Sequence, residues 1–433
     1  MTSRSHSPPK SRNMSIKAFK YRLSVNKATT KKLQWVLDRA RELYNAALTE
    51  RREAYEMHVK RHPGYYDEQT RKQLTRELTV DYYGQKRDLV DVKDLRPEYG
   101  DIASHMLQDV ITRVKRTYDR FFDRVKNGQK PGYPRFKGRN QYDSFTYPDH
   151  AGWKFTDLGS EDGKKHKGTL HLSKIGTVKI KMHREMQGKI KTLTMKREGE
   201  HWYCIFTCEV EGTALPISYE DVGIDLGVTH LASLSNGEFI DHPRHFRQAE
   251  KKLAKAQQAL SRKKKGSHRR SRAGKLLAKQ HRKVRNQRKD FHHKASRRLV
   301  DRYQVIVFED LQTKNLTTTP KPTQDEQGTY LPNGAAAKAG LNKSILDAGW
   351  STFTGMVVAK AASAGRTVIF VNPSMTSQLC SGCGAVVKKT LADRWHTCDC
   401  GTSLDRDTNS AKLILNLGYQ QLSGGTRPTR ETA

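Results

Sequence analysis

Four of the six cysteines lie between residues 380 and 400, and their spacing constrains the fold of this region more than any other feature does. Cys380 and Cys383 form a C-x2-C pair, and Cys398 and Cys400 form a C-x-C pair after a gap of fourteen residues. Two pairs of thiolates on tight turns suit one structural zinc ion, although the C-x-C spacing is uncommon and the gap slightly short. The alternatives are ordinary cysteines in a reduced protein, or disulfides, which a chain of this size without a secretion signal does not need.

The charge of the chain points to a polyanionic partner. The 433 residues include 80 Lys and Arg against 45 Asp and Glu, a net charge of +35 at pH 7. Such an excess predicts nucleic-acid binding, and the length predicts roughly two to four domains. No apolar run is long enough to span a membrane. Residues 1–13 are polar and basic, so they do not resemble a secretory signal and are expected to be a disordered extension.

The first half of the chain alternates between strand and helix patterns. Residues 17–25 have the two-residue period of a strand, and a helix with a clear 3.6-residue period is expected from Lys31. Asp101 is expected to cap a second long helix, which Asn127 and Gly128 end. Short antiparallel strands are then expected over residues 169–210. With the first strand they would close a small barrel that carries the helices as an insertion.

Two basic segments are candidates for contact with nucleic acid. Residues 130–139 read KPGYPRFKGR, an extended segment whose cations suit phosphates and whose aromatic rings suit bases; the alternative is a Pro- and Gly-rich linker. Residues 251–298 hold 20 Lys and Arg and a single acid, and are expected to form two helices with a turn near Gly266. A solvated face usually mixes charge signs, so phosphate contact is favoured here. The candidate contact residues are Arg135, Lys137, Arg139, Lys263, Lys264 and Lys265.

The second half of the chain predicts an α/β domain with three separated acids. Residues 222–228 form an apolar strand with Asp225 in its middle, and a buried strand over residues 303–308 is followed by Glu309. Asp407 lies at the start of the last helix. Carboxylates from separate elements can hold two Mg²⁺ ions for phosphodiester hydrolysis. The alternative is surface acids near strand ends.

Other elements of this half are expected around that sheet. A third strand is expected over residues 367–371, and a single helix over residues 341–364. Residues 317–340 are rich in Thr, Pro, Gly and Ala and are expected to form a loop.

The order of the motifs resembles the TnpB family, transposon-encoded RNA-guided DNA nucleases related to type V CRISPR effectors. The resemblance implies a RuvC-like nuclease domain of RNase H fold, with Asp225, Glu309 and Asp407 as the Mg²⁺-binding catalytic acids. Asp405 is the competitor for the third role, but the family pattern Asp-x-Asn matches residues 407–409. The stretches that carry the resemblance are residues 43–48, 131–139, 222–228, 253–265, 308–311, 344–350, 376–384 and 405–411.

The resemblance also implies the domain organisation of a multi-domain α/β protein. A wedge β-barrel carries a helical recognition insertion, and a zinc-ribbon insertion interrupts the nuclease domain. The expected segments are a disordered extension (1–14), the first wedge strand (15–27), the recognition insertion (28–130), the rest of the wedge (131–218), the RuvC-like domain (219–376), the zinc-binding target nucleic-acid domain (377–403), the final RuvC-like helix (404–418) and a disordered tail (419–433).

These features together predict an RNA-guided, Mg²⁺-dependent DNA endonuclease. Its expected partners are a guide RNA and a double-stranded DNA target with a short adjacent motif, bound by one protein chain in a cytoplasmic ribonucleoprotein. The alternatives are an RNA-guided DNA-binding protein that does not cut, or a transposase or its accessory factor. A protein that does not cut would be expected to lack one of the three acids, and all three are present.

Overall fold

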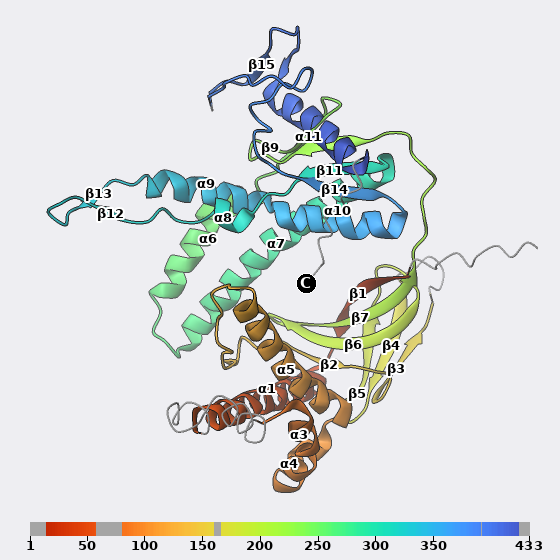
Figure 1. The fold of residues 1–433 in the computed structure, drawn as a ribbon. Helices are drawn as coiled ribbons and strands as arrows, with labels where there is room; N and C mark the ends of the chain where they lie inside the picture. Colours follow the sequence, from red (N-terminus) through yellow and green to blue (C-terminus); the bar gives the residue numbers. More distant parts are fainter. Residues whose placement is uncertain (1–13, 58–79, 160–165, 391, 424–433) are drawn as a thin grey trace, which may run out of the picture. The chain divides into compact units, whose positions relative to one another are not determined.

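The computed structural model divides the chain into two compact units, residues 16–210 and residues 211–433 (Figure 1). The expected extension before residue 14 and the end of the expected tail lie outside the described residues. The structure describes residues 14–57, 80–159, 166–390 and 392–423.

The unit of residues 16–210 combines a seven-stranded sheet with a group of helices. The strand order is β2-β6-β7-β1-β5-β4-β3, and β1 is joined to β2 through the helices. One core contains buried side chains of both the sheet and the helices α1 and α5. The elements are β1 (Met14–Ser24), α1 (Lys27–Tyr55), α3 (Tyr82–Arg87), α4 (Leu89–Leu95), η2 (Pro97–Asp101), α5 (Ser104–Lys126), β2 (Ser144–Tyr147), β3 (Trp153–Asp157), β4 (Lys167–Leu172), β5 (Gly176–Lys181), β6 (Lys189–Glu198) and β7 (His201–Glu211).

The predicted barrel is strongly curled but not closed by hydrogen bonds within the described residues. β2 and β3 are the two edge strands, yet only residues 148–152 connect them. Such a short connection spans at most about 20 Å, whereas the edges of a flat seven-stranded sheet would lie about 29 Å apart. The sheet must therefore curve until its two edges approach each other, which gives a barrel-like shape with an open seam.

Both long helices of this unit begin at residues other than those predicted. α1 begins at Lys27 rather than near Lys31, because the Asn26 side chain accepts a hydrogen bond from the backbone N–H of Thr29. α5 begins at Ser104, and Asp101 ends the short 3-10 helix η2 instead of capping α5. The predicted end of α5 at residues 127–128 is confirmed.

The unit of residues 211–433 is built on a five-stranded mixed sheet. Its order is β10-β9-β8-β11-β14; β8, β11 and β14 are parallel, and β9 is antiparallel to both β8 and β10. The elements are β8 (Val222–Asp225), β9 (His230–Leu234), β10 (Phe239–Asp241), α6 (His245–Ser261), α7 (His268–Arg302), β11 (Val305–Glu309), α8 (Thr313–Leu316), β12 (Thr323–Gln324), β13 (Tyr330–Leu331), α9 (Ala335–Ala348), α10 (Trp350–Ala364), β14 (Thr367–Val371), β15 (Trp395–Thr397), β16 (Ser403–Asp405) and α11 (Arg406–Ser423).

Helices cover both faces of this sheet. On β11, Ile306 and Phe308 pack in a core with α7 and α10, whereas Val307 packs with Ile414 of α11 on the opposite face. Successive side chains of a strand point to opposite faces, which explains why the strand is apolar throughout. Figure 1 shows α11 and α10 on opposite sides of the sheet.

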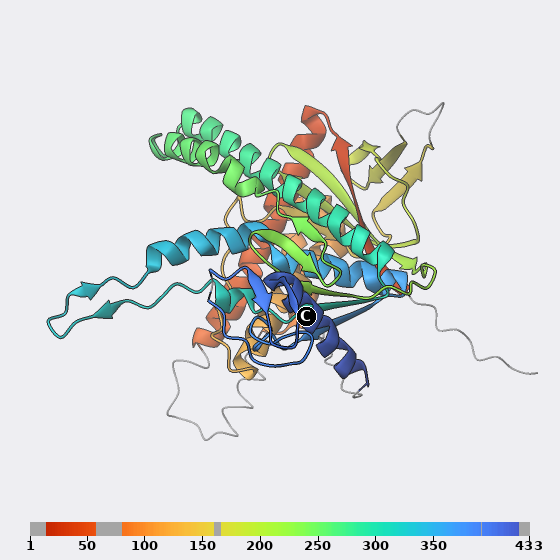
Figure 2. The same ribbon diagram turned by 90° about the horizontal axis from the view of Figure 1, so that it is seen from above.

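The strongly basic segment forms a helical hairpin. α6 and α7 lie side by side around Leu253, Leu277 and Val284, and both views show the pair extending from the sheet (Figure 2). The predicted turn near Gly266 is confirmed, and this glycine adopts φ +84°. The long C-terminal part of α7 joins the core beneath the sheet.

The helix predicted over residues 341–364 is two helices. α9 begins at Ala335, inside the predicted loop, and Gly349 separates it from α10 with φ +66°. The rest of the predicted loop includes a short hairpin of β12 and β13.

The last helix also differs from its expected extent, because it continues beyond Gly418 to Ser423. In the part of the chain that the structure describes, no helix combines the length and the apolar character that crossing a membrane requires.

Candidate functional site

Two acidic side chains lie at the carboxyl ends of neighbouring parallel strands. β8 ends at Asp225 and β11 ends at Glu309. Phe308 pairs with Ile224. The residues that follow them, Glu309 and Asp225, therefore lie side by side and face the same side of the sheet. Glu309 is buried and Asp225 is partly buried. The fold thus brings two of the three predicted acids together.

Asp407 approaches the same edge of the sheet from α11. A Cβ atom added to Gly223 would lie 2.0 Å from the carbonyl oxygen of Ala411, so the helix backbone lies directly against β8. Near the other end of α11, the hydroxyl of Tyr419 donates a 2.9 Å hydrogen bond to the aspartate that precedes β8. The helix therefore runs antiparallel to β8, and its first turn, with Asp407, lies where β8 ends at Asp225.

The two acids at the start of α11 have different surroundings. Asp405 accepts hydrogen bonds of 3.0 Å from the backbone N–H groups of Asp407 and Thr408, so its carboxylate is the N-cap of the helix. The Asp407 carboxylate instead receives two 3.1 Å hydrogen bonds from the guanidinium of Arg406. Asp405 is thus engaged with the helix backbone, whereas Asp407 is paired with a neighbouring cation.

Burial and like charges oppose ionisation of the two strand-end acids. Burial, followed by the negative charges of Glu309 and Asp407, raises the pKa of Asp225 well above its usual value. Burial also raises the pKa of Glu309, while a hydrogen bond from the Thr376 hydroxyl lowers it in part. Three carboxylates that repel one another in a poorly solvated place are stabilised by a bound cation.

The donor set fits hard divalent cations, since Mg²⁺ takes oxygen ligands and keeps several waters. The three carboxylates are not as tightly grouped as the cysteines are. In the described ranges, the cysteines alone form a group of three or more His, Cys, Asp or Glu side chains whose ligand atoms all lie within 4.8 Å of one another.

The four late cysteines converge as the sequence predicts. The Sγ atoms of Cys380 and Cys400 are 3.7 Å apart, and those of Cys383 and Cys398 are 3.6 Å apart. Four thiolates around zinc at a Zn–S distance near 2.3 Å would have S–S separations of about 3.8 Å. These two separations match a tetrahedral zinc ion, and all four sulfur atoms lie within 4.8 Å of one another.

Asn409 joins the cysteine turns to α11. This fully buried residue accepts a 2.9 Å hydrogen bond from the N–H of Ser381 and donates a 2.8 Å bond to the carbonyl of Leu379. About two turns further along α11, the exposed Asn416 donates a 3.3 Å hydrogen bond to the carbonyl of Ser381. The Asn of the Asp-x-Asn pattern thus attaches the first cysteine turn to the helix that carries Asp407.

The predicted basic contacts lie on both units. Lys263, Lys264 and Lys265 are exposed in the turn that joins α6 to α7. Arg135 and Arg139 are exposed in the extended segment of the other unit, where Arg139 lies 3.9 Å from Asp38.

The extended segment of residues 131–139 is fixed to α1. Asn45 accepts a 2.8 Å hydrogen bond from the N–H of Lys137 and donates a 3.1 Å bond to its carbonyl. The guanidinium of Arg52 lies over the rings of Tyr133 and Phe136, at 5.6 and 5.5 Å. The segment is therefore a structured edge of the helical group.

An aromatic surface continues from this segment onto α5. Phe122 is 53% exposed and Val125 is 49% exposed, although both belong to the apolar stripe of the helix. Phe136 of the extended segment is also exposed, at 45%. Exposed rings beside cations are suited to stacking on nucleic-acid bases.

Comparison with known proteins identifies the family. The family model OrfB_IS605, described as "Probable transposase", matches residues 205–319; "Cas12f1-like, TNB domain" matches residues 350–414, and a "Helix-turn-helix domain" matches residues 14–60. A Streptomyces pristinaespiralis protein named "Putative RNA-guided DNA endonuclease" is 32% identical over 429 residues, which cover 96% of this chain and 93% of that protein. The chain belongs to the TnpB family.

Another TnpB relative and one solved structure agree with this assignment. "Putative RNA-guided DNA endonuclease InsQ" of Escherichia coli (strain K12) is 31% identical over 328 residues, covering 75% of this chain and 77% of that protein. The fold resembles the chain in "Cryo-EM structure of the Cas12f1-sgRNA-target DNA complex", with a TM-score of 0.56, 12% identity and coverage of 94% and 99%. The fold of this TnpB protein is thus that of a Cas12f-type chain with a TNB domain.

Several residues of the TnpB site were not predicted from the sequence. Thr376 lies in a motif that the family resemblance uses, but its bond to Glu309 joins residues 67 positions apart. The roles of Asn409 and Arg52 likewise depend on tertiary contacts. For Thr376 and Asn409 the only signal in the sequence is a polar residue inside a motif, and Arg52 lies outside the motifs altogether.

Proposed function

We propose that this TnpB protein is an RNA-guided DNA endonuclease whose RuvC-like site consists of Asp225, Glu309 and Asp407. The convergence of the three acids at one edge of the five-stranded sheet carries this proposal. The sheet supports it as well, because three parallel strands extended by an antiparallel β8-β9-β10 meander are the arrangement expected of an RNase H fold.

The three carboxylates would hold the metal ions that the reaction needs. Two Mg²⁺ ions, when bound, supply the charge that activates an attacking water and stabilises the leaving oxygen. Thr376 donates to Glu309 and Arg406 donates to Asp407, so these two carboxylates are oriented before substrate arrives. Arg406 lies beside Asp407 and is placed to counter the negative charge of a phosphate.

The guide RNA and the target DNA are proposed to bind the basic surfaces. The net charge of +35 and the exposed lysines at the tip of the α6–α7 hairpin support backbone contact. The names of the two relatives support an RNA guide and a DNA substrate. Base pairing by the guide would select the target, while the protein reads backbone shape and a short adjacent motif.

The domain roles follow from the same proposal. The barrel-like sheet would be the wedge, the helices α1 to α5 the recognition insertion, and the cysteine turns a zinc-binding target nucleic-acid domain inserted before α11. The predicted nucleic-acid contacts would come from Arg135, Lys137 and Arg139 in the first unit and from residues 263–265 in the second. One chain per ribonucleoprotein is proposed.

The test measures cleavage and target binding separately. The protein is purified with its co-expressed guide RNA, and a matched DNA duplex is added with Mg²⁺. Asp225→Ala, Glu309→Ala and Asp407→Ala should each reduce cleavage by at least about 10³-fold, since removing a metal ligand removes activation of the water. Target binding should remain within a few-fold of wild type.

The control is Asp241→Ala, which removes an exposed acid from β10 of the same sheet. It should cut at the wild-type rate. Cleavage by Asp225→Ala would overturn the proposed site. An inactive Asp405→Ala variant beside an active Asp407→Ala variant would show that Asp405, and not Asp407, is the third acid.

A further inference from the structure

The turn between α9 and α10 packs closely against side chains of α7. Gly349 has φ +66°, and a Cβ atom there would lie 2.8 Å from Nη2 of Arg288 and 3.0 Å from Cε1 of His292. Two carbonyls beside it accept bonds from the same helix: Leu346 from Arg288 at 2.5 Å, and Ala348 from Nε2 of His292 at 2.9 Å. The turn therefore fixes the position of α7.

The same turn caps α6, the other helix of the basic hairpin. Asp347 is buried and accepts hydrogen bonds from the backbone N–H groups of Phe246 (3.1 Å) and Arg247 (3.3 Å). The residue that precedes α6, Arg244, makes no side-chain cap of its own. Asp347 thus supplies from another element the acceptor that the first turn of α6 needs.

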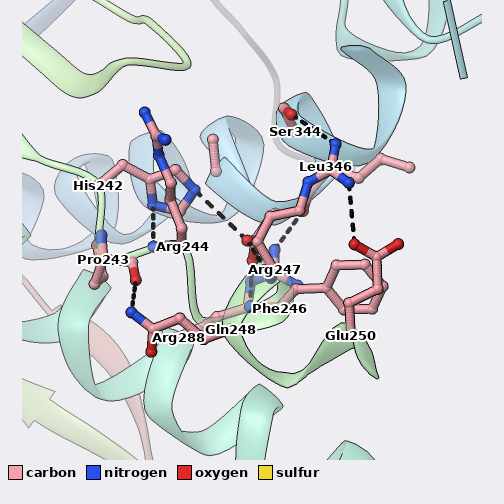
Figure 3. Close-up of polar contacts among 12 residues, drawn as sticks. His242, Pro243, Arg244, Phe246, Arg247, Gln248, Glu250, Arg288, Ser344 and Leu346 are labelled. Carbon is pink, nitrogen blue, oxygen red and sulfur yellow. Dashed lines mark hydrogen bonds and ion pairs between the residues drawn. The ribbon is translucent and has the colours of Figure 1, made fainter. Parts of the chain in front are cut away.

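Further polar contacts surround this cap. Arg247 donates to Glu250, to the carbonyl of Gly340 and to Ser344. His242 and Arg288 lie near the buried carboxylate. Figure 3 shows the side chains of α6, α7 and α9 converging here.

The last residue of the turn contacts the segment that follows Asp225. The indole N–H of Trp350 donates a 3.1 Å hydrogen bond to the carbonyl of Gly227, two residues after Asp225, and the indole is itself buried. Gly227 begins the turn into β9, where its N–H contacts the Leu231 carbonyl at 3.4 Å. The indole therefore fixes the backbone immediately after Asp225, where β8 ends.

We propose that Trp350 is a positioning residue for Asp225, and that Asp347 and Trp350 together fix the basic hairpin and the catalytic strand end to one shared turn. This inference rests on the proposed nuclease function. The hairpin is where nucleic acid is proposed to bind, and Asp225 is where metal is proposed to bind. A support common to both keeps the substrate backbone in register with the carboxylates.

The first test removes the indole N–H while keeping an aromatic ring. Trp350→Phe should raise by about 3- to 10-fold the Mn²⁺ concentration that half-saturates the guide-loaded protein, since one hydrogen bond that orients the site is lost. Mn²⁺ alone is the probe, and bound ion is measured by electron paramagnetic resonance. Mg²⁺-dependent cleavage should require a similarly higher ion concentration, with target binding unchanged.

The matched control is Trp153→Phe. Trp153 also donates from its indole to a backbone carbonyl, that of Asp149 at 2.7 Å, but it lies in the barrel-like unit. It should leave Mn²⁺ binding at the wild-type value even if the melting temperature falls equally. Equal Mn²⁺ affinities for Trp350→Phe and Trp153→Phe would overturn the positioning role.

The second test concerns Asp347. Asp347→Asn keeps a side-chain oxygen that can accept from α6, whereas Asp347→Ala keeps none. The Asn variant should restore most of the cleavage that the Ala variant loses, and Ala should also weaken Mn²⁺ binding. Mn²⁺ binding by Asp225→Ala separates the two proposals. If this variant binds Mn²⁺ as wild type does, the nuclease site itself is wrong. If it loses Mn²⁺ binding while the Trp350→Phe and Asp347→Ala variants bind normally, only this inference is wrong.

Discussion

The hydroxyl of Thr376 donates a 2.5 Å hydrogen bond to Oε1 of Glu309, and both side chains are buried. Thr376 follows β14 and Glu309 ends β11, the neighbouring strand. The bond therefore orients a proposed metal ligand from outside its own strand. Because a donated hydrogen bond favours the ionised carboxylate, it also opposes the increase in the pKa of Glu309 that burial causes.

Thr376→Val should move the acidic limb of the cleavage profile to higher pH. Valine has nearly the shape of threonine but donates no hydrogen bond, so the pKa of Glu309 should rise further and the ionised form should require a higher pH. Single-turnover cleavage rates across the pH range measure the shift, and Thr376→Ser should restore the wild-type limb. A valine profile that is lower but unshifted would show that the hydroxyl does not act through ionisation.

Mg²⁺-free protein that keeps its zinc should lose stability as the pH rises through the titration of Asp225. Burial and the charges of Glu309 and Asp407 raise its pKa in the folded state, so the folded chain retains a proton that the unfolded chain releases above about pH 4. Unfolding free energy from this group is thus greatest below the unfolded pKa and falls until the folded pKa has been passed.

Asp225→Asn removes that titration and supplies the comparison. In buffer without Mg²⁺ or chelator, the melting temperature of the variant should exceed that of wild type increasingly from pH 5 to pH 8, by about 2–4 °C for each kcal/mol in a unit of this size. Mg²⁺ should raise the melting temperature of wild type and have little effect on the variant. A difference in melting temperature between variant and wild type that stays the same at all pH values would contradict a raised pKa of Asp225.

The cysteine turns should bind about one zinc ion per chain. Cys380→Ser should lose it, and the turns that Asn409 attaches to α11 should then unfold, because structural zinc contributes on the order of 10 kcal/mol to small domains. Cleavage should fall with the zinc content. Elemental analysis of purified protein makes the measurement.

Cys204→Ala is the control for the cysteine experiment. Cys204 is buried in β7, where burial raises its pKa to about 12, so it is a poor ligand. The variant should keep its zinc although it loses a buried side chain. Full cleavage by a zinc-free Cys380→Ser protein would refute a structural role for the ion.

The turn between α6 and α7 should contribute to salt-dependent binding. Replacing Lys263, Lys264 and Lys265 with Ala should reduce the slope of log affinity against log salt concentration, because each phosphate contact contributes close to one unit on duplex DNA. Binding is measured on guide-loaded protein between 50 and 200 mM salt, concentrations over which such contacts are sensitive.

A triple variant of equal charge separates local contact from net charge. Lys154, Lys179 and Lys181 are exposed on β3 and β5, and their replacement removes the same three charges. If the slope falls equally in both triple variants, or in neither, residues 263–265 make no specific phosphate contact and are an ordinary solvated surface.

The sheet of the second unit was predictable because its strands are short apolar runs. Residues 222–225, 305–309 and 367–371 follow the predicted segments closely, and acids at the ends of parallel strands are expected to meet. The preference for Asp407 over Asp405 came from the family pattern Asp-x-Asn, because a cap and a ligand are both acids at a helix start and composition alone does not distinguish them. That the three acids form the catalytic set stays a prediction.

The break at Gly349 was missed for a physical reason. The apolar pattern continues across the glycine, and one glycine inside a helix costs only about 1 kcal/mol, so the local signal favours one helix. At the break Gly349 adopts φ +66°, and Arg288 and His292 of α7 approach it closely, which is a tertiary contact. The contacts of Thr376 and Asn409 also join distant segments, which no local pattern reports.

The placement of Asp407 on α11, the last helix described, has a consequence for synthesis of the protein. A nascent chain emerges from its N-terminus, and its domains fold as units in that order. The barrel-like unit and the basic hairpin precede α11, so they can fold and associate with RNA while the edge of the sheet still holds two acids. Under the proposed mechanism, cleavage becomes possible only when α11 docks against Gly223, after the parts that engage the guide have been made.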